Sequence, residues 1–227
     1  MGFGSVPATR RPAVGEGAGS VAALLAAVAV KDPYTAGHAH RVAVGAELIG
    51  RGLGLPPERC AQLRLTGLLH DIGKLAVSTP VLRKSEELTA ADVAELHDHP
   101  ARGVDLLADL EVPAEVLAGV LHHHERMDGA GYPDRLAAGA IPEFARAVAV
   151  ADAYDAMTTR RPYGRVRTPV EALDELWSAA GTQFDPVMVA AFADALRQLL
   201  PAPSEGDFIA QVGSPPGNRQ RFFATTR

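Results

Sequence analysis

Two short stretches of the chain combine side chains that metal-dependent hydrolases use. Residues 70–74 read His-Asp-Ile-Gly-Lys, and residues 123–133 read His-His-Glu-Arg-Met-Asp-Gly-Ala-Gly-Tyr-Pro. Adjacent histidines suit metal ions that lie side by side, because neutral imidazole binds most divalent transition metals. The glycines before Tyr132 permit a loop to turn back over such a site. The two stretches together suggest one metal centre built from distant parts of the chain.

Further metal-binding side chains lie on other predicted helices. The candidate ligands are His38, His70, Asp71, His99, His123, His124 and Asp152. A lone histidine on a helix is usually a core or surface residue, but here five separate segments each supply one or two donors. A set of nitrogen and oxygen donors without thiolates favours iron, manganese, zinc or nickel over a cysteine-rich structural zinc site.

Asp71 is the natural bridging ligand, because a carboxylate has two oxygens and can contact two metals. Ions about 3.5–4 Å apart can share a hydroxide and polarise a phosphoryl oxygen, an arrangement that cleaves phosphate esters. Lys74 is close in sequence, and its ammonium can neutralise a phosphate oxygen as charge builds. The ordinary alternative for Lys74 is a solvated surface position.

The composition excludes several classes of protein. The chain has 227 residues and a net charge of −5, which argues against broad binding to a nucleic-acid polymer. The single cysteine, Cys60, cannot form an internal disulfide and fits a reducing cytoplasm.

One segment has some features of an export signal. Arg10 and Arg11 precede the apolar run 21–30, but a membrane span needs about 20 apolar residues. The run also leads almost directly into His38, so cleavage after it would cut close to the metal site. We therefore expect a cytoplasmic protein with no membrane segment.

Prolines and capping residues mark the expected helix boundaries. The predicted helices cover residues 20–30, 38–51, 56–71, 93–97, 100–107, 113–124, 143–159 and 187–200, with another that starts at Pro169. No alternating strand pattern stands out. The chain is therefore predicted to be all-α, with a single domain over residues 20–200, a flexible arm over 1–19 and a flexible tail over 201–227.

The motifs resemble those of the HD-GYP family, the metal-dependent cyclic di-GMP phosphodiesterases of the HD phosphohydrolase superfamily. The resemblance extends from about Val28 to Phe192, and residues 123–133 are its most specific part. The other matching stretches are 32–35 with His38, 70–74, His99-Pro100 with Gly103, 151–158, 161–163 and 181–186.

The resemblance implies a role for each matching residue. One metal would bind His70, Asp71 and Asp152, with His38 as a further candidate ligand, and the other would share Asp71 and bind His99, His123 and His124. These would be two divalent ions, with iron or manganese favoured and zinc or nickel as alternatives. Lys74 would contact the scissile phosphate, Asp155 and Arg161 would contact the guanine or ribose-phosphate, and Tyr132 would form a lip over the cleft. In similar proteins this lip is linked to contact with diguanylate cyclases (GGDEF proteins).

The implied reaction is hydrolysis of cyclic di-GMP to linear pGpG, with GMP after a second cut. The chain departs from the family at two positions. Tyr34 stands where some members carry a glutamate that holds a third metal, so a two-metal site is expected. Gly164 replaces a basic residue, although Arg165 is a substitute.

Two other functions remain open at this point. The chain could hydrolyse another nucleotide, or it could be a non-catalytic module that senses cyclic di-GMP or docks a cyclase. The sequence does not decide whether the protein forms a homodimer. For Glu125, orienting a ligand histidine and simple solvation are equally compatible with the pattern.

Overall fold

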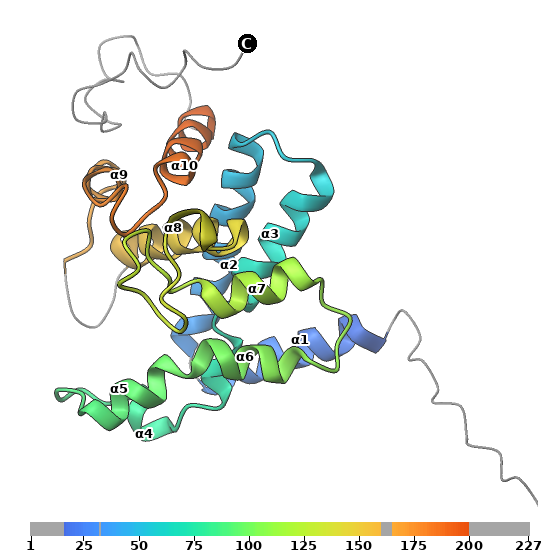
Figure 1. Ribbon diagram of the computed structural model, residues 1–227. Helices are drawn as coiled ribbons and strands as arrows, with labels where there is room; N and C mark the ends of the chain where they lie inside the picture. Colours follow the sequence, from blue (N-terminus) through green and yellow to red (C-terminus); the bar gives the residue numbers. More distant parts are fainter. Residues whose placement is uncertain (1–15, 32, 160–164, 200–227) are drawn as a thin grey trace, which may run out of the picture.

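The computed structural model describes residues 16–31, 33–159 and 165–199, and these residues form a helical domain (Figure 1). The helices are α1 (Glu16–Lys31), α2 (Pro33–Gly52), α3 (Pro57–Leu69), α4 (Thr79–Leu82), α5 (Ala90–His97), α6 (His99–Leu107), α7 (Ala114–His122), α8 (Glu143–Thr158), α9 (Pro169–Ser178) and α10 (Pro186–Leu199), with 3-10 turns η1 (Ile72–Leu75) and η2 (Ala138–Ala140). Within the described ranges the only extended pairing is an isolated bridge between Ala180 and Phe184. The all-α prediction is confirmed.

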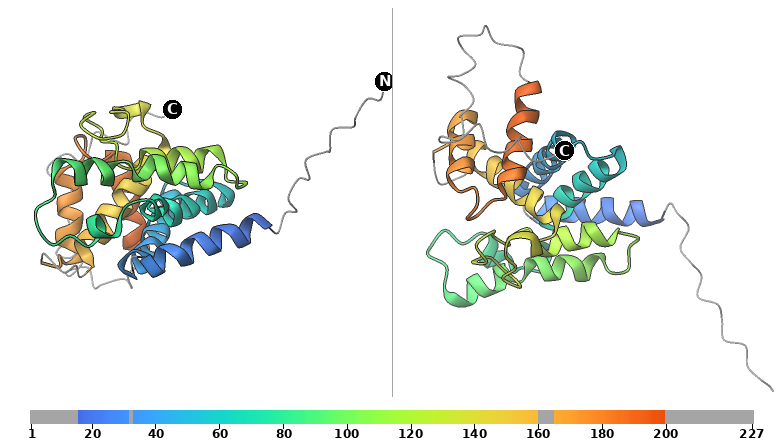
Figure 2. Two further views of the ribbon diagram at one scale, coloured as in Figure 1. Left: turned by 90° about the horizontal axis from the view of Figure 1, so that it is seen from below. Right: turned by 45° about the horizontal axis from the view of Figure 1, so that its top comes forward.

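Helix α2 forms the centre of the domain. It packs against α3 on one side and against α8 and α10 on the others, as two further views show (Figure 2). Its inward residues Val42, Ala46 and Ile49 are fully buried, as is Val148 of α8. Gly45 of α2 lies against Ala151 of α8, and these small residues let the two helices approach closely, so side chains from several helices can meet near α2.

The helix ends follow the local sequence as predicted. Thr89 accepts a hydrogen bond from the backbone N–H of Asp92, whose side chain accepts one in return from Thr89. Thr168 and Glu171 form the same reciprocal cap at the start of α9. Such capping boxes satisfy backbone donors that the first helical turn leaves unpaired.

Some boundaries differ from the prediction. Helix α1 begins at Glu16, so residues 16–19 are helical although a flexible arm was expected there. Helix α2 begins at Pro33 instead of near His38, since proline is well tolerated in a first turn. The short elements η1 and α4 were not predicted, because each is too short to show a periodic apolar pattern. Residues 1–15 and 200–227, most of the predicted arm and tail, lie outside the described residues.

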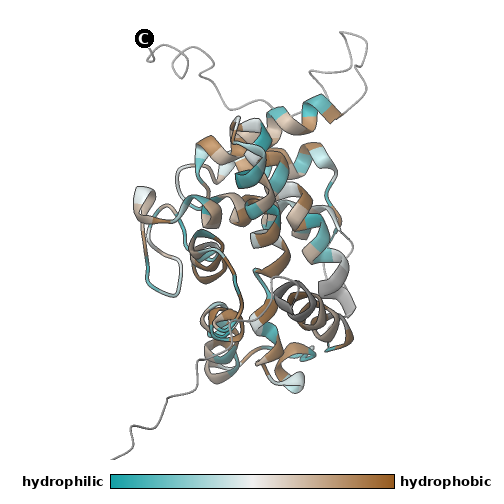
Figure 3. Ribbon diagram, turned by 90° about the vertical axis from the view of Figure 1, so that its right-hand side faces the viewer, coloured by the Kyte–Doolittle hydropathy of each residue, from teal (hydrophilic) through white to brown (hydrophobic). Residues whose placement is uncertain are grey.

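The helices carry both apolar and polar stretches along their length (Figure 3). Among the described helices, none combines the length and apolar character that crossing a bilayer requires.

Candidate metal centre

Helix α3 and the turn after it place the first two candidate ligands. His70 follows the last residue of α3 and is almost completely buried, and its Nδ1 lies 2.7 Å from the carbonyl oxygen of Gly67. Asp71 comes next and precedes η1. Because a carbonyl oxygen can only accept, Nδ1 of His70 donates this hydrogen bond, and Nε2 is left to face the site.

His99 and His123 are held in the same way. Nδ1 of His99 lies 2.7 Å from the carbonyl oxygen of Leu96, and Nδ1 of His123 lies 2.7 Å from that of Val120. Both imidazoles therefore direct Nε2 into the site. Backbone carbonyls that fix the ring and tautomer of a histidine are the usual support for metal ligands.

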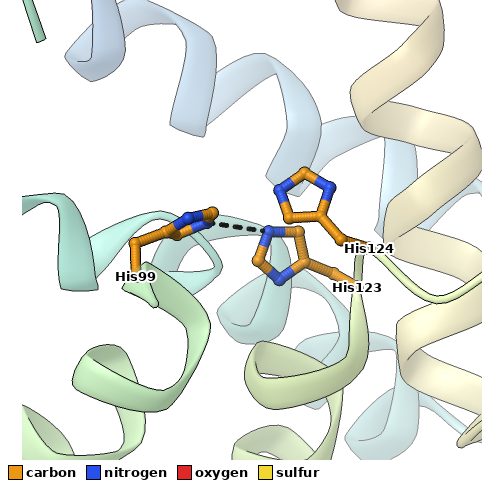
Figure 4. A group of neighbouring side chains, drawn as sticks. All are labelled: His99, His123 and His124. Atoms are coloured by element: carbon orange, nitrogen blue, oxygen red, sulfur yellow. Dashed lines mark hydrogen bonds between the residues drawn. The ribbon is translucent and has the colours of Figure 1, made fainter. Parts of the chain in front are cut away.

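The Nε2 atoms of His99 and His123 face each other at 3.4 Å, with His124 beside them (Figure 4). Burial, with neighbouring histidines, lowers the pKa of His123 well below its ordinary value and lowers that of His124 to about 4. The rings of His123 and His124 are therefore neutral near pH 7, as metal ligands must be. Two imidazoles about 2.1 Å from one ion would stand about 3.4 Å apart at a tetrahedral angle, which matches the separation of the Nε2 atoms of His99 and His123.

His38, His70 and Asp152 form a second group of donors. Nε2 of His38 lies 3.2 Å from Oδ1 of Asp152, and ligand atoms of all three residues lie within 4.8 Å of one another. Nε2 of His70 is buried without a hydrogen-bond partner, which is costly unless a cation or water completes it. Burial disfavours the charged form of His38, but the carboxylates of Asp152 and Asp155 outweigh it and raise the pKa of His38 to about 9.

Asp71 lies between the two groups. Its Oδ1 is 3.3 Å from Nε2 of His99, whereas its Oδ2 is 3.3 Å from Nε2 of His70 and 3.7 Å from Nε2 of His38. Nζ of Lys74 lies 2.6 Å from the same Oδ2. Burial favours the neutral acid, yet the Lys74 ammonium and the His70 ring hold the pKa of Asp71 well below its ordinary value.

The structure therefore brings all seven candidate ligands together. Three sets of ligand atoms fit within 4.8 Å: His99, His123 and His124; His38, His70 and Asp152; and His70, Asp71 and His123. The neutral rings of His123 and His124, the unpartnered Nε2 of His70 and the buried Asp71 carboxylate match what divalent transition metals require.

The ligands can converge because the backbone of η1 lies very close to the backbone of α6. A Cβ on Gly73 would lie 1.8 Å from the carbonyl oxygen of His99 and 2.5 Å from the backbone nitrogen of Gly103. Only glycine lets η1 lie against the first turn of α6, and this contact sets Asp71 beside His99.

The loop that carries Tyr132 closes over the His124 side of the site. The Tyr132 ring stacks on His97 with centroids 3.9 Å apart and on His124 with centroids 4.8 Å apart. Burial, followed by the charges of Asp71 and Asp152, raises the pKa of the Tyr132 hydroxyl. A Cβ on Gly131 would lie 2.5 Å from the Cα of Glu125, so the loop folds tightly on its own start.

Glu125 has neither of the two roles considered for it. Its side chain is fully buried, and Oε1 accepts a hydrogen bond of 2.7 Å from the backbone N–H of Asp134. It therefore ties the far end of the Tyr132 loop to its beginning and does not orient a ligand histidine or face solvent.

The remaining predicted residues are placed only in part. Asp155 is buried and contacts His38. Arg161 and Gly164 lie outside the described residues, and so does the side chain of Tyr34. Arg41, which binds Asp155, was not predicted. Its only signal in the sequence is its position about one turn after His38 on the same helix.

Known proteins similar to this chain include phosphodiesterases that act on cyclic dinucleotides. The HD domain family model matches residues 23–188. A cyclic di-GMP phosphodiesterase of Pseudomonas aeruginosa is 43% identical over 179 residues, which cover 77% of this chain and 42% of the relative. A 3'3'-cGAMP-specific phosphodiesterase of Vibrio cholerae is 39% identical over 174 residues, which cover 76% of this chain and 37% of the relative.

The fold is also shared with a solved structure. The crystal structure of a cyclic GMP-AMP specific phosphodiesterase of V. cholerae matches with a TM-score of 0.60 and 22% identity, over 78% of this chain and 48% of that one. The chain spans less than half the length of these relatives. The family match covers most of the described chain, including the His70-Asp71 pair, and the chain belongs to the HD domain family.

Proposed function

We propose that this chain is a metal-dependent phosphodiesterase that hydrolyses cyclic di-GMP to linear pGpG, and then to GMP after a second cut. The observation that carries the proposal is the position of Asp71, whose two oxygens face two separate groups of ligands. The names of the relatives support the substrate class.

The ligand groups suit two divalent ions. His38, His70 and Asp152 would hold one, and His99, His123 and His124 would hold the other, with Asp71 shared between them. Iron or manganese is favoured, and zinc or nickel also fits this donor set. When bound, the metals would polarise a phosphoryl oxygen and lower the pKa of a water, which would attack the phosphorus and displace the ribose 3′-oxygen.

The protein's own residues would bind and orient the substrate. The Lys74 side chain is about one-quarter exposed, and its Nζ lies at the Asp71 carboxylate, so its ammonium can reach a phosphate oxygen beside the metals. Tyr132 is fixed by His97 and His124, and it would hold the substrate at the edge of the site. Arg161 remains a proposed contact to the guanine or the ribose-phosphate.

A second candidate substrate is 3'3'-cGAMP. A relative with 39% identity is specific for it, and Gly164 lacks the positive charge expected for one phosphate contact. Both substrates present the same phosphodiester linkage, so the metal chemistry would be unchanged and the base-contacting residues would decide the preference.

We also propose a cytoplasmic location, where cyclic dinucleotides and the reduced thiol of Cys60 are both expected. A diguanylate cyclase that docks on the Tyr132 loop and a homodimer remain proposals about partners.

The test uses protein purified without oxygen and loaded with Fe²⁺ or Mn²⁺. It is incubated with cyclic di-GMP, 3'3'-cGAMP and cyclic di-AMP, and the products are separated by chromatography. We expect linear dinucleotide from cyclic di-GMP, and no product from His70→Ala. Asp105→Asn is the matched control, because Asp105 is an exposed carboxylate on α6. Tight binding of cyclic di-GMP without turnover by the wild type would contradict the proposal and favour a sensing module.

A further inference from the structure

Asp155 has no capacity left to bind a nucleotide. Its carboxylate is buried and accepts four contacts: from Nδ1 of His38 at 2.7 Å, from Nε of Arg41 at 2.5 Å, from Nη2 of Arg41 at 3.1 Å and from Oγ1 of Thr159 at 3.0 Å. An ionised carboxylate offers about four lone-pair sites. All of them are used by this chain's own side chains.

We infer that Asp155 is a positioning residue for the metal ligand His38, and that Arg41 anchors Asp155 in that role. The two nitrogens of the His38 ring face different carboxylates, with Nδ1 on Asp155 and Nε2 on Asp152. A proton on Nδ1 that is donated to Asp155 leaves Nε2 to bind a metal. This replaces the base or ribose-phosphate contact expected for Asp155 from its place in the sequence.

His38 differs from three other histidines of the site in how it is held. His70, His99 and His123 each donate Nδ1 to the backbone carbonyl three residues earlier. Those bonds are local in the sequence and do not depend on any other side chain. His38 lies inside α2, where the backbone carbonyls are already paired, and it relies on a carboxylate from α8.

Arg41 makes this support stable. Its guanidinium binds both oxygens of Asp155, a geometry that fixes the plane of a carboxylate. Arg41 and His38 are three residues apart on α2, so they face α8 together. The Arg41 side chain is 46% exposed, whereas Asp155 and His38 are buried. The orientation of a buried metal ligand thus depends on a cation at the surface.

The inference rests on the proposed metal centre, and its first readout is metal binding without any substrate. Asp155→Asn keeps the shape of the side chain but weakens its bonds to Arg41 and to His38. Loss of a carboxylate behind a ligand histidine typically lowers metal affinity about 10–100-fold. We expect this loss for one of two metal equivalents, measured by elemental analysis after dialysis against a weak chelator.

The second readout separates positioning from substrate contact. We expect Asp155→Asn to lower kcat with a KM for cyclic di-GMP within about twofold of wild type. Added metal should restore much of the activity. Unchanged metal affinity with a KM raised about tenfold would instead place Asp155 on the substrate and overturn the inference. If the wild type fails to hydrolyse any cyclic dinucleotide, the metal measurement still decides the role of Asp155.

Two further variants protect the test against a folding failure. Arg41→Ala leaves Asp155 in place without its anchor and should reduce the same metal equivalent, whereas Arg41→Lys should recover part of it. In the His38→Ala background, Asp155→Asn should cause no additional loss of metal, because its effect passes through His38. An additive loss would contradict the inference.

The matched control is Glu47→Gln. Glu47 also lies on α2 and also pairs with two arginines, Arg51 and Arg64, but at the surface away from the metal centre. When the protein is loaded with Co²⁺, the Glu47→Gln variant should bind both metal equivalents and show the same absorption spectrum as wild type. The Asp155 variant should alter that spectrum, which reports the geometry around the ions.

Discussion

Oδ1 of Asp71 lies 3.3 Å from Nε2 of His99, although the two residues belong to different elements of the chain. The turn after α3 carries Asp71, and α6 begins with His99. With its other oxygen 3.3 Å from Nε2 of His70, Asp71 places one carboxylate oxygen beside each group of metal donors.

Replacing Asp71 with asparagine should therefore impair both ligand groups. The amide has no charge and presents only one oxygen, so it cannot bridge two cations. Because metal assistance is worth several kcal/mol of transition-state stabilisation, we expect kcat/KM to fall by about 10³-fold or more. Metal content per chain should also drop, as elemental analysis would show. Activity within tenfold of wild type would argue against a bridging role.

The contact between η1 and α6 can be tested with a single methyl group. In Gly73→Ala, the new Cβ would overlap the carbonyl oxygen of His99 and must push η1 away from α6. Overpacking of this kind costs about 1–3 kcal/mol, and it should also separate Asp71 from His99. We expect a lower melting temperature and weaker metal binding.

Gly139→Ala is the control for this substitution, because nothing lies within 4 Å of a Cβ added there. Its melting temperature and metal binding should match wild type. Equal behaviour of the two variants would mean that the tight packing at Gly73 does not position the site.

Substitutions at Tyr132 can distinguish the role of its ring from the role of its hydroxyl. Tyr132→Phe keeps the stacking on His97 and His124 but removes the hydroxyl, whose pKa is raised by burial and then by the charges of Asp71 and Asp152. A hydrogen bond to a charged group contributes about 1.5–3 kcal/mol, so loss of one to the substrate phosphate should lower kcat/KM about 10–100-fold. Metal content should stay at the wild-type level.

Removing the ring should have a different effect. In Tyr132→Ala or His97→Ala the stack is broken, and we expect faster hydrogen exchange in the loop 125–134. The Phe variant should keep the exchange rate of the wild type. Loss of metal from the Phe variant would show that the hydroxyl supports the ligands and not the substrate.

Glu125 should stabilise the Tyr132 loop through its backbone hydrogen bond. In Glu125→Ala, the N–H of Asp134 loses its acceptor and a cavity opens beneath the loop. An unmade buried hydrogen bond costs about 1–3 kcal/mol, which chemical denaturation would detect. Glu125→Gln retains an acceptor oxygen and should recover much of the loss. If Glu125→Ala and Glu125→Gln had the same free energy of unfolding, the hydrogen bond to Asp134 would not be what stabilises the loop.

The sequence predicted much of the fold because its helix boundaries are local. Proline fixes the backbone at a helix start, and pairs such as Thr89 and Asp92 satisfy the first turn, so these ends needed no knowledge of distant contacts. The early start of α1 at Glu16 was missed, since a glycine-rich segment has low intrinsic helix propensity.

The sequence predicted the candidate metal ligands, but it did not predict the residues that hold those ligands and the nearby loop in position. Histidines and aspartates have recognisable chemistry and spacing, whereas Arg41 and Glu125 act through partners on other segments. Asp155 shows the limit most clearly. Its helical position three residues after Asp152 placed it near the site, but only the contact with His38 shows what its carboxylate oxygens bind.

The most direct test of the two-metal account is anomalous diffraction from crystals of the protein loaded with Fe²⁺ or Mn²⁺ under exclusion of oxygen. We predict two anomalous peaks about 3.5–4 Å apart, one beside His70 and Asp152, the other beside His99 and His123, with Asp71 between them. A single peak, or peaks away from Asp71, would contradict the account.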